Sequence, residues 1–335
     1  MALLGMNSFQ LYTEDTYEIE GEPFFGYFRG GYSKKELMEV DDYAFDLGIE
    51  VFPCIQTLGH LGQILQWPEY VKVRDTAEVM LCGSEETYKL IEKMVQVSTC
   101  FRSKKIHVGC DEAHGLSEGR YKQIFGSKDS AQVFIEHLNR VNEICLRNDL
   151  EPLIWSDMLY TLAAKNDSIS AYYDQNVNPL GRIPSNMTLV YWDYYHTSHL
   201  PVSQKITQHR ELGFEPWVAG GIWTWNRFVT GAISLHSNAL LSACKLAKIK
   251  NVFVTLWGDD GNEFDLKSAM PGFCYFSERF YSNTEDIDES IKKSFAGIFG
   301  GNLDDFNMAS KVDCISQEYS SDENFHFPPN MSKKK

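Results

Sequence analysis

The sequence predicts an α/β protein folded as a (β/α)8 barrel of the TIM type, in which seven strands are visible and the first strand is missing. Two observations support this fold. Short apolar runs alternate with amphipathic helical stretches, a pattern typical of a parallel sheet covered by helices. Nearly every apolar run also ends in a tryptophan or a carboxylate, and a barrel gathers all such strand ends around one mouth.

Seven runs are expected to form the strands, and they cover residues 9–15, 49–57, 105–112, 152–158, 188–195, 216–225 and 251–261. Their starts are spaced by roughly 40 residues, which suits a strand followed by a crossover helix. The clearest helix is 33–48, because Ser33 and Glu36 form a capping box and Gly48 supplies a stop. Residues 84–101, 129–149 and 231–251 have similar helical patterns.

The alternative parallel architecture is an open, doubly wound sheet. Such sheets bind dinucleotides through a GxGxxG turn after a strand, and no such turn follows any of the seven runs. The ring of aromatic and acidic residues at the strand ends has a simple explanation only at a barrel mouth. We therefore favour the barrel, and we expect no cofactor.

Both ends of the chain depart from a complete barrel. The segment ALLGMN at residues 2–7 resembles the last turn of a helix that leads into the run at 9–15. We therefore expect that a preceding strand and most of its helix are missing, and that the chain is a truncated product or a fragment. Residues 1–282 are predicted to form the barrel domain, and 283–335 the start of a helical C-terminal region with a polar, disordered tail.

The composition disfavours several classes of partner. The chain has 335 residues, 46 acidic and 31 basic, and its formal charge is −15. This acidic balance disfavours nucleic acids and anionic membrane surfaces as partners, and no run of roughly 18 apolar residues predicts a membrane span. Eight scattered cysteines without CxxC pairs, and the absence of a secretory signal, indicate a cytoplasmic protein with neither a disulfide framework nor a metal site.

The most informative motif is HVGCDE at residues 107–112. An arbitrary DE pair is usually an exposed loop dipeptide, but this one follows a buried strand in a chain with tryptophans at its strand ends. Neighbouring strand residues point to opposite faces, so Asp111 and Glu112 enter one pocket only if the chain turns just after Asp111. A pair so placed suits an ionised carboxylate beside a protonated general acid.

The tryptophans at the strand ends indicate a sugar ligand. An indole ring packs on the C–H face of a pyranose, while carboxylates accept hydrogen bonds from its hydroxyls. Five of the seven tryptophans lie at strand ends: Trp155, Trp192, Trp223, Trp225 and Trp257. Trp67 and Trp217 are assigned to packing, and one or two of the five have the same alternative.

HVGCDE resembles the H-x-G-x-D-E signature of family 20 glycoside hydrolases, the β-N-acetylhexosaminidases. The segments LYTEDTYE, PCIQTLGHL, LIWSDML, YWDYY and LWGDDGNE are similar to its hexosaminidase D-like branch and to bacterial exo-hexosaminidases. The resemblance implies a (β/α)8 barrel that removes terminal β-linked GlcNAc or GalNAc with retention of configuration. In this family the substrate's own 2-acetamido oxygen attacks the anomeric carbon and gives an oxazolinium intermediate.

The resemblance also implies roles at the reaction centre. Glu112 would be the general acid and then the base that activates water, and Asp111 would accept the acetamide N–H. His60 matches the histidine that hydrogen-bonds toward the acid, and Asp15 matches the carboxylate behind that histidine. A helix cap or a buried structural histidine is the alternative for His60.

The residues assigned to sugar binding lie at the ends of four later strands. They are Trp155, Asp157, Trp192, Tyr194, Trp225, Trp257 and Asp259. Tyr194 is the candidate to hold the acetamide oxygen, with Tyr191 and Tyr195 as alternatives, and Asp260 is the alternative to Asp259. The arginine that the family carries on its first strand has no counterpart, since Arg29 lies in a different loop.

Three other functions are alternatives to substrate-assisted hydrolysis of N-acetylhexosamine. Because the first strand is missing, a barrel that binds N-acetylhexosamine sugars without turnover is the main alternative. A metal-dependent hydrolase would use His107, Asp111 and Glu112 as ligands, but the nine histidines have no HxH or HExxH spacing. A serine or cysteine nucleophile has no GxSxG turn, and Cys110 is expected to be a small buried apolar group.

Overall fold

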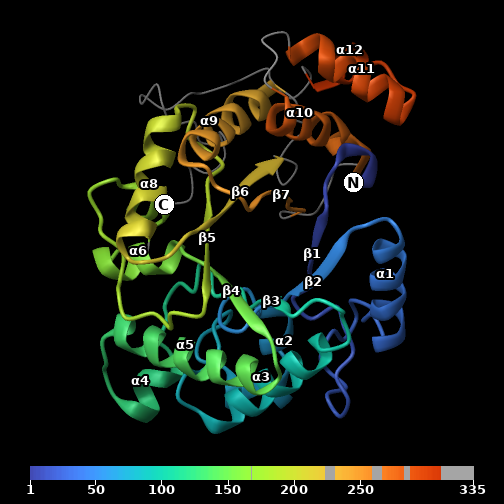
Figure 1. The fold of residues 1–335 in the computed structure, drawn as a ribbon. Helices are drawn as coiled ribbons and strands as arrows, with labels where there is room; N and C mark the ends of the chain where they lie inside the picture. Colours follow the sequence, from blue (N-terminus) through green and yellow to red (C-terminus); the bar gives the residue numbers. More distant parts are fainter. Residues whose placement is uncertain (167, 223–230, 259–265, 283–286, 311–335) are drawn as a thin grey trace.

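The fold is a curled sheet of parallel strands with helices on its outer side (Figure 1). It is taken from a computed structural model that describes residues 1–310 except 167, 223–230, 259–265 and 283–286. Within these residues no helix is long and apolar enough to cross a membrane.

Seven strands form the sheet: β1 Ser8–Tyr12, β2 Glu50–Cys54, β3 Lys105–His107, β4 Glu151–Trp155, β5 Thr188–Trp192, β6 Trp217–Ile222 and β7 Val252–Leu256. They are hydrogen-bonded in the order of the chain, and every pair is parallel. The predicted seven-stranded partial barrel is therefore confirmed. In the described part of the chain, β1 and β7 are the two edges and no strand pairs with both.

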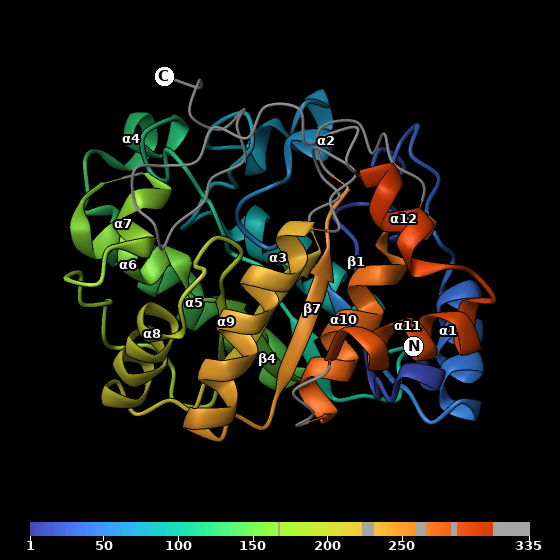
Figure 2. The ribbon, with the colours of Figure 1, turned by 90° about the horizontal axis from the view of Figure 1, so that it is seen from above.

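Helices follow the strands and pack against the outside of the curled sheet (Figure 2). Between strands they are α1 Lys34–Asp46, α2 Gly62–Leu65, η2 Pro68–Val73, α3 Glu85–Ser98, α4 Arg120–Phe125, α5 Ser130–Arg147, α6 Asp157–Ala164, α7 Ile169–Tyr173, α8 His199–Glu211 and α9 Gly231–Ala247. After β7 come η3 Leu266–Ala269, α10 Met270–Tyr281, α11 Ile287–Phe299 and α12 Leu303–Ser310. Parallel strands need crossovers of this kind, and they place all carboxyl strand ends at one mouth.

All seven strands end before the predicted runs do, and β3, with three residues, is the shortest. The run at 105–112 is predicted to continue to a turn just after Asp111, but β3 ends at His107. The reason is local, because Gly109 and Cys110 have φ values of 71° and 70°, which a strand cannot accommodate. The motif HVGCDE is therefore mostly a loop at the barrel mouth.

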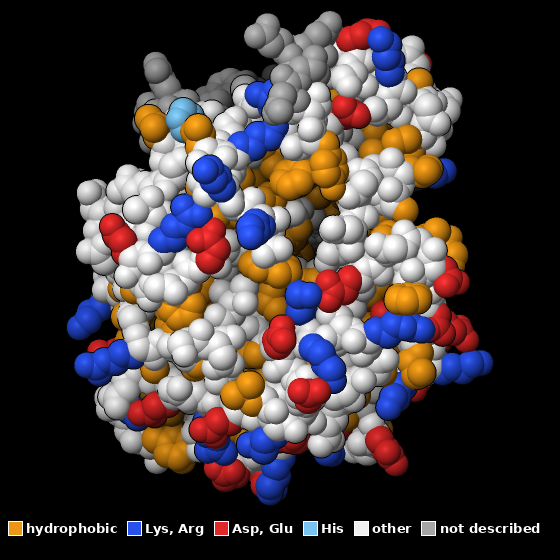
Figure 3. All heavy atoms as spheres, in the orientation of Figure 1, with side chains coloured by type: hydrophobic (Ala, Val, Ile, Leu, Met, Phe, Trp, Pro, Cys, Tyr) orange, Lys and Arg blue, Asp and Glu red, His pale blue; other side chains and the backbone are white. Residues whose placement is uncertain are grey.

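The core lies between the sheet and its helices. The inner strands β2, β4, β5 and β6 bury every residue after their first, whereas β1 is half-buried throughout and β7 has one buried residue. Figure 3 shows the face of the molecule that is seen in Figure 1, with hydrophobic side chains at its centre. Incomplete burial at β1 and β7 is the expected property of the two edges of an open sheet.

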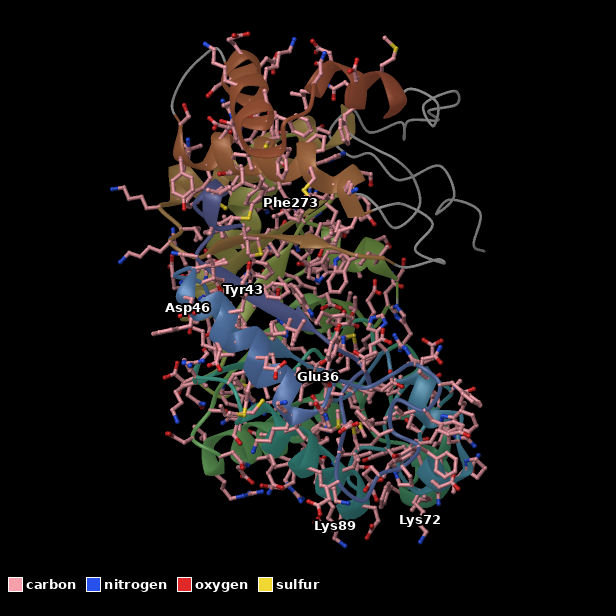
Figure 4. The ribbon with its side chains drawn as sticks, turned by 90° about the vertical axis from the view of Figure 1, so that its right-hand side faces the viewer. Glu36, Tyr43, Asp46, Lys72, Lys89 and Phe273 are labelled. Atoms are coloured by element: carbon pink, nitrogen blue, oxygen red, sulfur yellow. The ribbon has the colours of Figure 1, made fainter. Side chains whose placement is uncertain are left out.

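A second, smaller core joins the beginning of the chain to the last helices. The short helix η1, Ala2–Leu4, contributes Leu4, which clusters with Cys274, Ile291, Phe295 and Leu303, and Phe273 of α10 packs against this group (Figure 4). The Tyr281 hydroxyl donates to the Gly5 carbonyl at 2.6 Å. The predicted domain boundary at residue 282 stays a prediction.

The capping box of α1 gives a test of local stability. Glu36 N–H donates to the Ser33 hydroxyl, and Ser33 N–H donates to the Glu36 carboxylate at 2.8 Å, which confirms the predicted helix start. Loss of such a cap costs about 1 kcal/mol. We expect Ser33→Ala to lower the free energy of unfolding by this amount in urea titrations, and Ser84→Ala, at an N-cap of α3 without a side-chain bond, to lower it less. Equal losses would contradict the capping role.

Candidate active site

The loop after β3 turns sharply and carries the two adjacent carboxylates. Three consecutive or near-consecutive residues have positive φ: Gly109 at 71°, Cys110 at 70° and Glu112 at 44°. Gly109 cannot be replaced without movement, since a Cβ there would lie 2.0 Å from Gln56 Oε1. Non-glycine residues in this conformation store backbone strain, which is concentrated at functional sites.

The turn places the carboxylates of Asp111 and Glu112 next to the imidazole of His60. His60 Nε2 lies 3.3 Å from Asp111 Oδ2 and 3.5 Å from Glu112 Oε2. His60 belongs to the loop after β2 and also has a positive φ, at 54°. Its side chain is 32% exposed, that of Asp111 15% and that of Glu112 36%, so the group of three opens to the solvent at the barrel mouth.

The charges of this group stabilise one another. Burial alone would lower the pKa of His60, but the charges and hydrogen bonds of Asp111 and Glu112 raise it well above its usual value. Burial alone would raise the pKa of Asp111, but the His60 charge and hydrogen bonds from His60 and Gln56 hold it below its usual value. An imidazolium beside an ionised Asp111 is therefore the favoured state of the pair.

Gln56 fixes the orientation of Asp111 from behind. Its amide nitrogen donates to Asp111 Oδ1 at 2.9 Å, and its oxygen accepts the Cys110 N–H at 3.2 Å. The same amide nitrogen lies 3.4 Å from the hydroxyl of Tyr12, which is 3.2 Å from Glu14 Oε1. One side chain from the loop after β2 thus links the reactive loop to the end of β1.

Asp157 holds the backbone of Glu112. Its Oδ2 accepts the Glu112 N–H at 2.9 Å, and its side chain is almost completely buried. Burial and the neighbouring charge of Asp111 raise the pKa of Asp157 to about 8. The carboxyl at the start of α6 is therefore a fixed support beneath the general-acid candidate.

Aromatic residues that follow β5 and β7 lie near these carboxylates at the mouth. The hydroxyl of Tyr194 accepts hydrogen bonds from Trp257 Nε1 at 3.0 Å and from Thr255 Oγ1 at 3.2 Å, and its ring stacks on Trp192 at 5.0 Å. The Trp257 ring lies 6.2 Å from that of Trp155. Burial and the charges of Asp111 and Glu112 raise the pKa of Tyr194, so these carboxylates and the aromatic residues share one region.

Comparison with known proteins identifies the family of this chain. Residues 15–208 match the catalytic-domain model of glycosyl hydrolase family 20, over more than half of the chain. The chain belongs to glycosyl hydrolase family 20. It is therefore a member of a family of glycoside hydrolases.

Two curated relatives are similar to part of this chain. The chain is 26% identical over 230 residues to hexosaminidase D of Homo sapiens, covering 64% of this chain and 45% of the relative. It is 26% identical over 235 residues to hexosaminidase D of Bos taurus, covering 66% of this chain and 62% of the relative. The chain thus spans about half to two thirds of the length of these relatives.

Among solved structures, the fold is similar to a β-N-acetylhexosaminidase from Bacteroides fragilis, with a TM-score of 0.64, 19% identity, and coverage of 91% of this chain and 65% of the other. It is also similar to a family 20 exo-β-N-acetylglucosaminidase from Vibrio harveyi in complex with N-acetylglucosamine, with a TM-score of 0.62, 15% identity, and coverage of 92% and 54%. At these identities the structures establish the shared fold.

The structure brings some predicted site residues together and separates others. Asp111, Glu112 and His60 converge, but the expected contact between His60 and Asp15 is absent from the described residues. Asp15 instead accepts a hydrogen bond from Arg29 at 2.9 Å, because the loop after β1 folds back over it. Trp225, Trp223 and Asp259 lie outside the described residues.

Trp155 and Trp192 are both buried. Trp155 is 2% exposed and packs 4.4 Å from the ring of His107, while Trp192 is 7% exposed. The Tyr191 hydroxyl donates to Asp193 at 2.5 Å, and the Tyr194 hydroxyl accepts from Trp257 and Thr255, so the choice of Tyr194 stays a prediction. Cys110 is fully buried, as expected for a small apolar group.

Two residues of the site, Gln56 and Tyr12, were not predicted from the sequence. Both lie within segments that were recognised, but neither was singled out. A signal for Gln56 was available, since a polar amide two residues after the end of a buried inner strand must find partners when it is buried. Tyr12 gave no comparable signal, because an aromatic residue at a strand end is common.

Gly109 gives a test of the turn that carries the carboxylates. Gly109→Ala combines a positive φ with a collision against Gln56, whereas Gly48→Ala has a similar φ of 73° and nothing within 4 Å. We expect Gly48→Ala to lower the free energy of unfolding by about 1 kcal/mol and Gly109→Ala by about 3 kcal/mol. Urea titrations of both variants measure the difference, and similar losses would contradict the close packing of Gly109 on Gln56.

Asp157 gives a test of pH dependence. An unfolded aspartate titrates near pH 4, so between about pH 4 and about pH 8 the folded chain keeps a proton that the unfolded chain has lost. The free energy of unfolding therefore falls with rising pH by up to about 1.4 kcal/mol per unit from this group. Asp157→Asn keeps an oxygen acceptor for Glu112 N–H and removes this titration, so its stability should fall less from pH 5 to pH 8.

Urea titrations at several pH values measure this slope. Asp46→Asn is the matched control, because Asp46 is exposed on α1 (Figure 4). We expect this control to follow the native chain. An Asp157→Asn slope equal to the native slope would show that Asp157 is ionised across the whole range.

Proposed function

We propose that this chain is a retaining exo-β-N-acetylhexosaminidase that removes terminal β-linked GlcNAc or GalNAc by substrate-assisted catalysis through an oxazolinium intermediate. The observation that carries the proposal is the convergence of Asp111, Glu112 and His60 within 3.5 Å at the mouth of a family 20 barrel. The named activities of the relatives support it, since they are a hexosaminidase D and β-N-acetylhexosaminidases.

Asp111 is the proposed partner of the acetamide group. An ionised carboxylate accepts the acetamide N–H, aligns the acetamide oxygen with the anomeric carbon and stabilises the positive charge that develops on the oxazolinium ring. The lowered pKa of Asp111, due to His60 and Gln56 acting against its burial, supports this role. Its two oxygens are held from different sides, Oδ1 by Gln56 and Oδ2 by His60.

Glu112 is the proposed general acid and base. In the first step it gives its proton to the glycosidic oxygen as the bond to the leaving sugar breaks. In the second step it takes a proton from water, which then opens the oxazolinium ring at the anomeric carbon and restores the acetamide. Its partly exposed side chain, next to His60 and fixed through its backbone by Asp157, supports this exchange of protons.

The aromatic residues are the proposed wall of the sugar pocket. Trp257 and Tyr194 are joined by a hydrogen bond, and the Tyr194 hydroxyl is the proposed partner of the acetamide oxygen. Trp155, Trp192 and Asp157 complete the described part of the pocket, and Trp225 and Asp259 are proposed from the family resemblance. Trp155 and Asp157 act from buried positions, as supports of the pocket.

We also propose a cytoplasmic location and, as the partner, a small-molecule or glycan substrate with a terminal N-acetylhexosamine. The seven described cysteines form no disulfide, a state that suits a reducing compartment. The acidic net charge of −15 argues against nucleic acid as a partner. A terminal N-acetylhexosamine is the part of the glycan that the pocket would recognise.

Hydrolysis of 4-nitrophenyl β-GlcNAc and β-GalNAc tests the proposal. We expect Glu112→Gln to lower kcat about 10³-fold, since general acid–base catalysis contributes on the order of 10²–10⁴. We expect Asp111→Asn to lower kcat at least about 100-fold, as loss of one charge-stabilising group does. Replacing the acetamide by trifluoroacetamide should also lower kcat, because the weakened oxygen is the nucleophile.

Glu118→Gln is the matched control, since Glu118 is an exposed glutamate of the same loop. It should keep the native kcat. Turnover that is unaffected by Glu112→Gln would contradict the assignment of the acid. Tight binding of a thiazoline analogue without any turnover would instead establish the sugar-binding barrel as the function.

A further inference from the structure

A cluster of aromatic side chains stands beside the barrel mouth, outside the pocket. It consists of Phe24, Tyr27 and Phe28 from the loop after β1 and Trp67 from the segment after α2, and is here called the aromatic rim. Their ring centroids are 4.2 Å apart for Tyr27 and Phe28 and 5.2 Å apart for Tyr27 and Trp67. Phe28 is 85% exposed and Tyr27 44%, so the rim offers aromatic surface to the solvent.

The aromatic rim is held firmly in place. Gly26 has a φ of 69°, and a Cβ there would lie 2.3 Å from the carbonyl oxygen of Asp15, so the loop packs directly on the chain beyond β1. The buried ring of Phe25 lies 4.9 Å from that of Tyr17. A surface fixed in this way loses little entropy when it receives a ligand.

The sequence neighbours of the aromatic rim link it to the reaction centre. Arg29, next to Phe28 in sequence, donates to Glu14 at 2.6 Å, and Glu14 is linked through Tyr12 and Gln56 to Asp111. On the other side, Trp67 follows α2, which begins two residues after His60. In Figure 2, α2 lies at the edge toward which the β7 arrow points, the carboxyl end of the sheet.

We propose that the aromatic rim is a binding platform for the sugar residues on the leaving-group side of the cleaved bond. The inference rests on the proposed function, because the general acid must stand on the side of the leaving sugar. Glu112 contacts His60, and the chain runs from His60 through α2 to Trp67. A glycan whose end is held in the pocket would therefore extend over this rim.

The chemistry of the aromatic rim suits a glycan. Pyranose rings stack on aromatic faces, and their hydroxyls need polar partners beside those faces. Arg29 and Glu14 supply such partners, with side chains that are 35% and 25% exposed. A guanidinium donates and a carboxylate accepts, so this pair can contact neighbouring hydroxyls of one sugar.

The experiment compares two probes that differ only beyond the cleaved bond. Chitotriose carries two further GlcNAc residues, whereas GlcNAc fluoride carries a leaving group without a face to stack. We expect Phe28→Ala to lower kcat/KM for chitotriose about 10-fold and to leave that for the fluoride within about 2-fold. Phe28→Tyr, which keeps a ring, should restore the native value.

Trp67→Ala should act in the same direction as Phe28→Ala. Tyr43→Ala is the matched control, because Tyr43 is 71% exposed on α1, outside the rim (Figure 4). It should leave both probes unchanged. Equal effects of Phe28→Ala on the two probes, or no effect on either, would overturn the platform, as would a change in sedimentation showing that the rim joins two copies of the chain.

The platform and the proposed function fail in different ways. If the native chain hydrolyses neither probe, the proposed function fails. Calorimetric titration with chitotriose then decides the platform alone: about 10-fold weaker binding by Phe28→Ala than by the native chain supports it, and equal binding, or no binding by either, overturns it.

Discussion

One imidazole facing two consecutive carboxylates is the contact on which the site depends. Consecutive residues of a strand point to opposite faces, so Asp111 and Glu112 reach His60 together only where the strand has ended. The left-handed conformations at Gly109, Cys110 and Glu112 produce this ending. The close packing of Gly109 on Gln56 then makes the turn and the support of Asp111 one structural unit.

The contact of His60 with Asp111 and Glu112 also explains the charge states of the neighbouring groups. Two neighbouring carboxylates repel one another unless a cation or a proton separates them, and His60 lies within 3.5 Å of both. The repulsion extends to Asp157, where burial and the Asp111 charge favour the protonated form near neutral pH. A hydrogen bond from Glu112 N–H holds this third carboxyl in place, so the mouth concentrates acidic groups without leaving them unsupported.

Local patterns in the sequence were sufficient for much of the fold and for the centre of the site. The seven strands and the Ser33 capping box follow from short-range periodicity and spacing, and HVGCDE carries its chemistry within six residues. The partner of Asp15 could not be found in this way, because the loop at Gly26 brings Arg29 onto it. Gln56 is a similar case, since its role depends on how two loops meet.

The two edges of the open sheet and the candidate active site are coupled through side chains at the mouth. β1 and β7 share no backbone hydrogen bonds in the described part of the chain, yet the ring of Tyr12, at the end of β1, lies 4.8 Å from Trp257, just after β7. Trp257 also donates to Tyr194, and the Tyr12 hydroxyl lies near Gln56. Separation of the two edges would therefore disturb the aromatic wall and the support of Asp111 together, so the geometry of the site depends on how far the barrel closes.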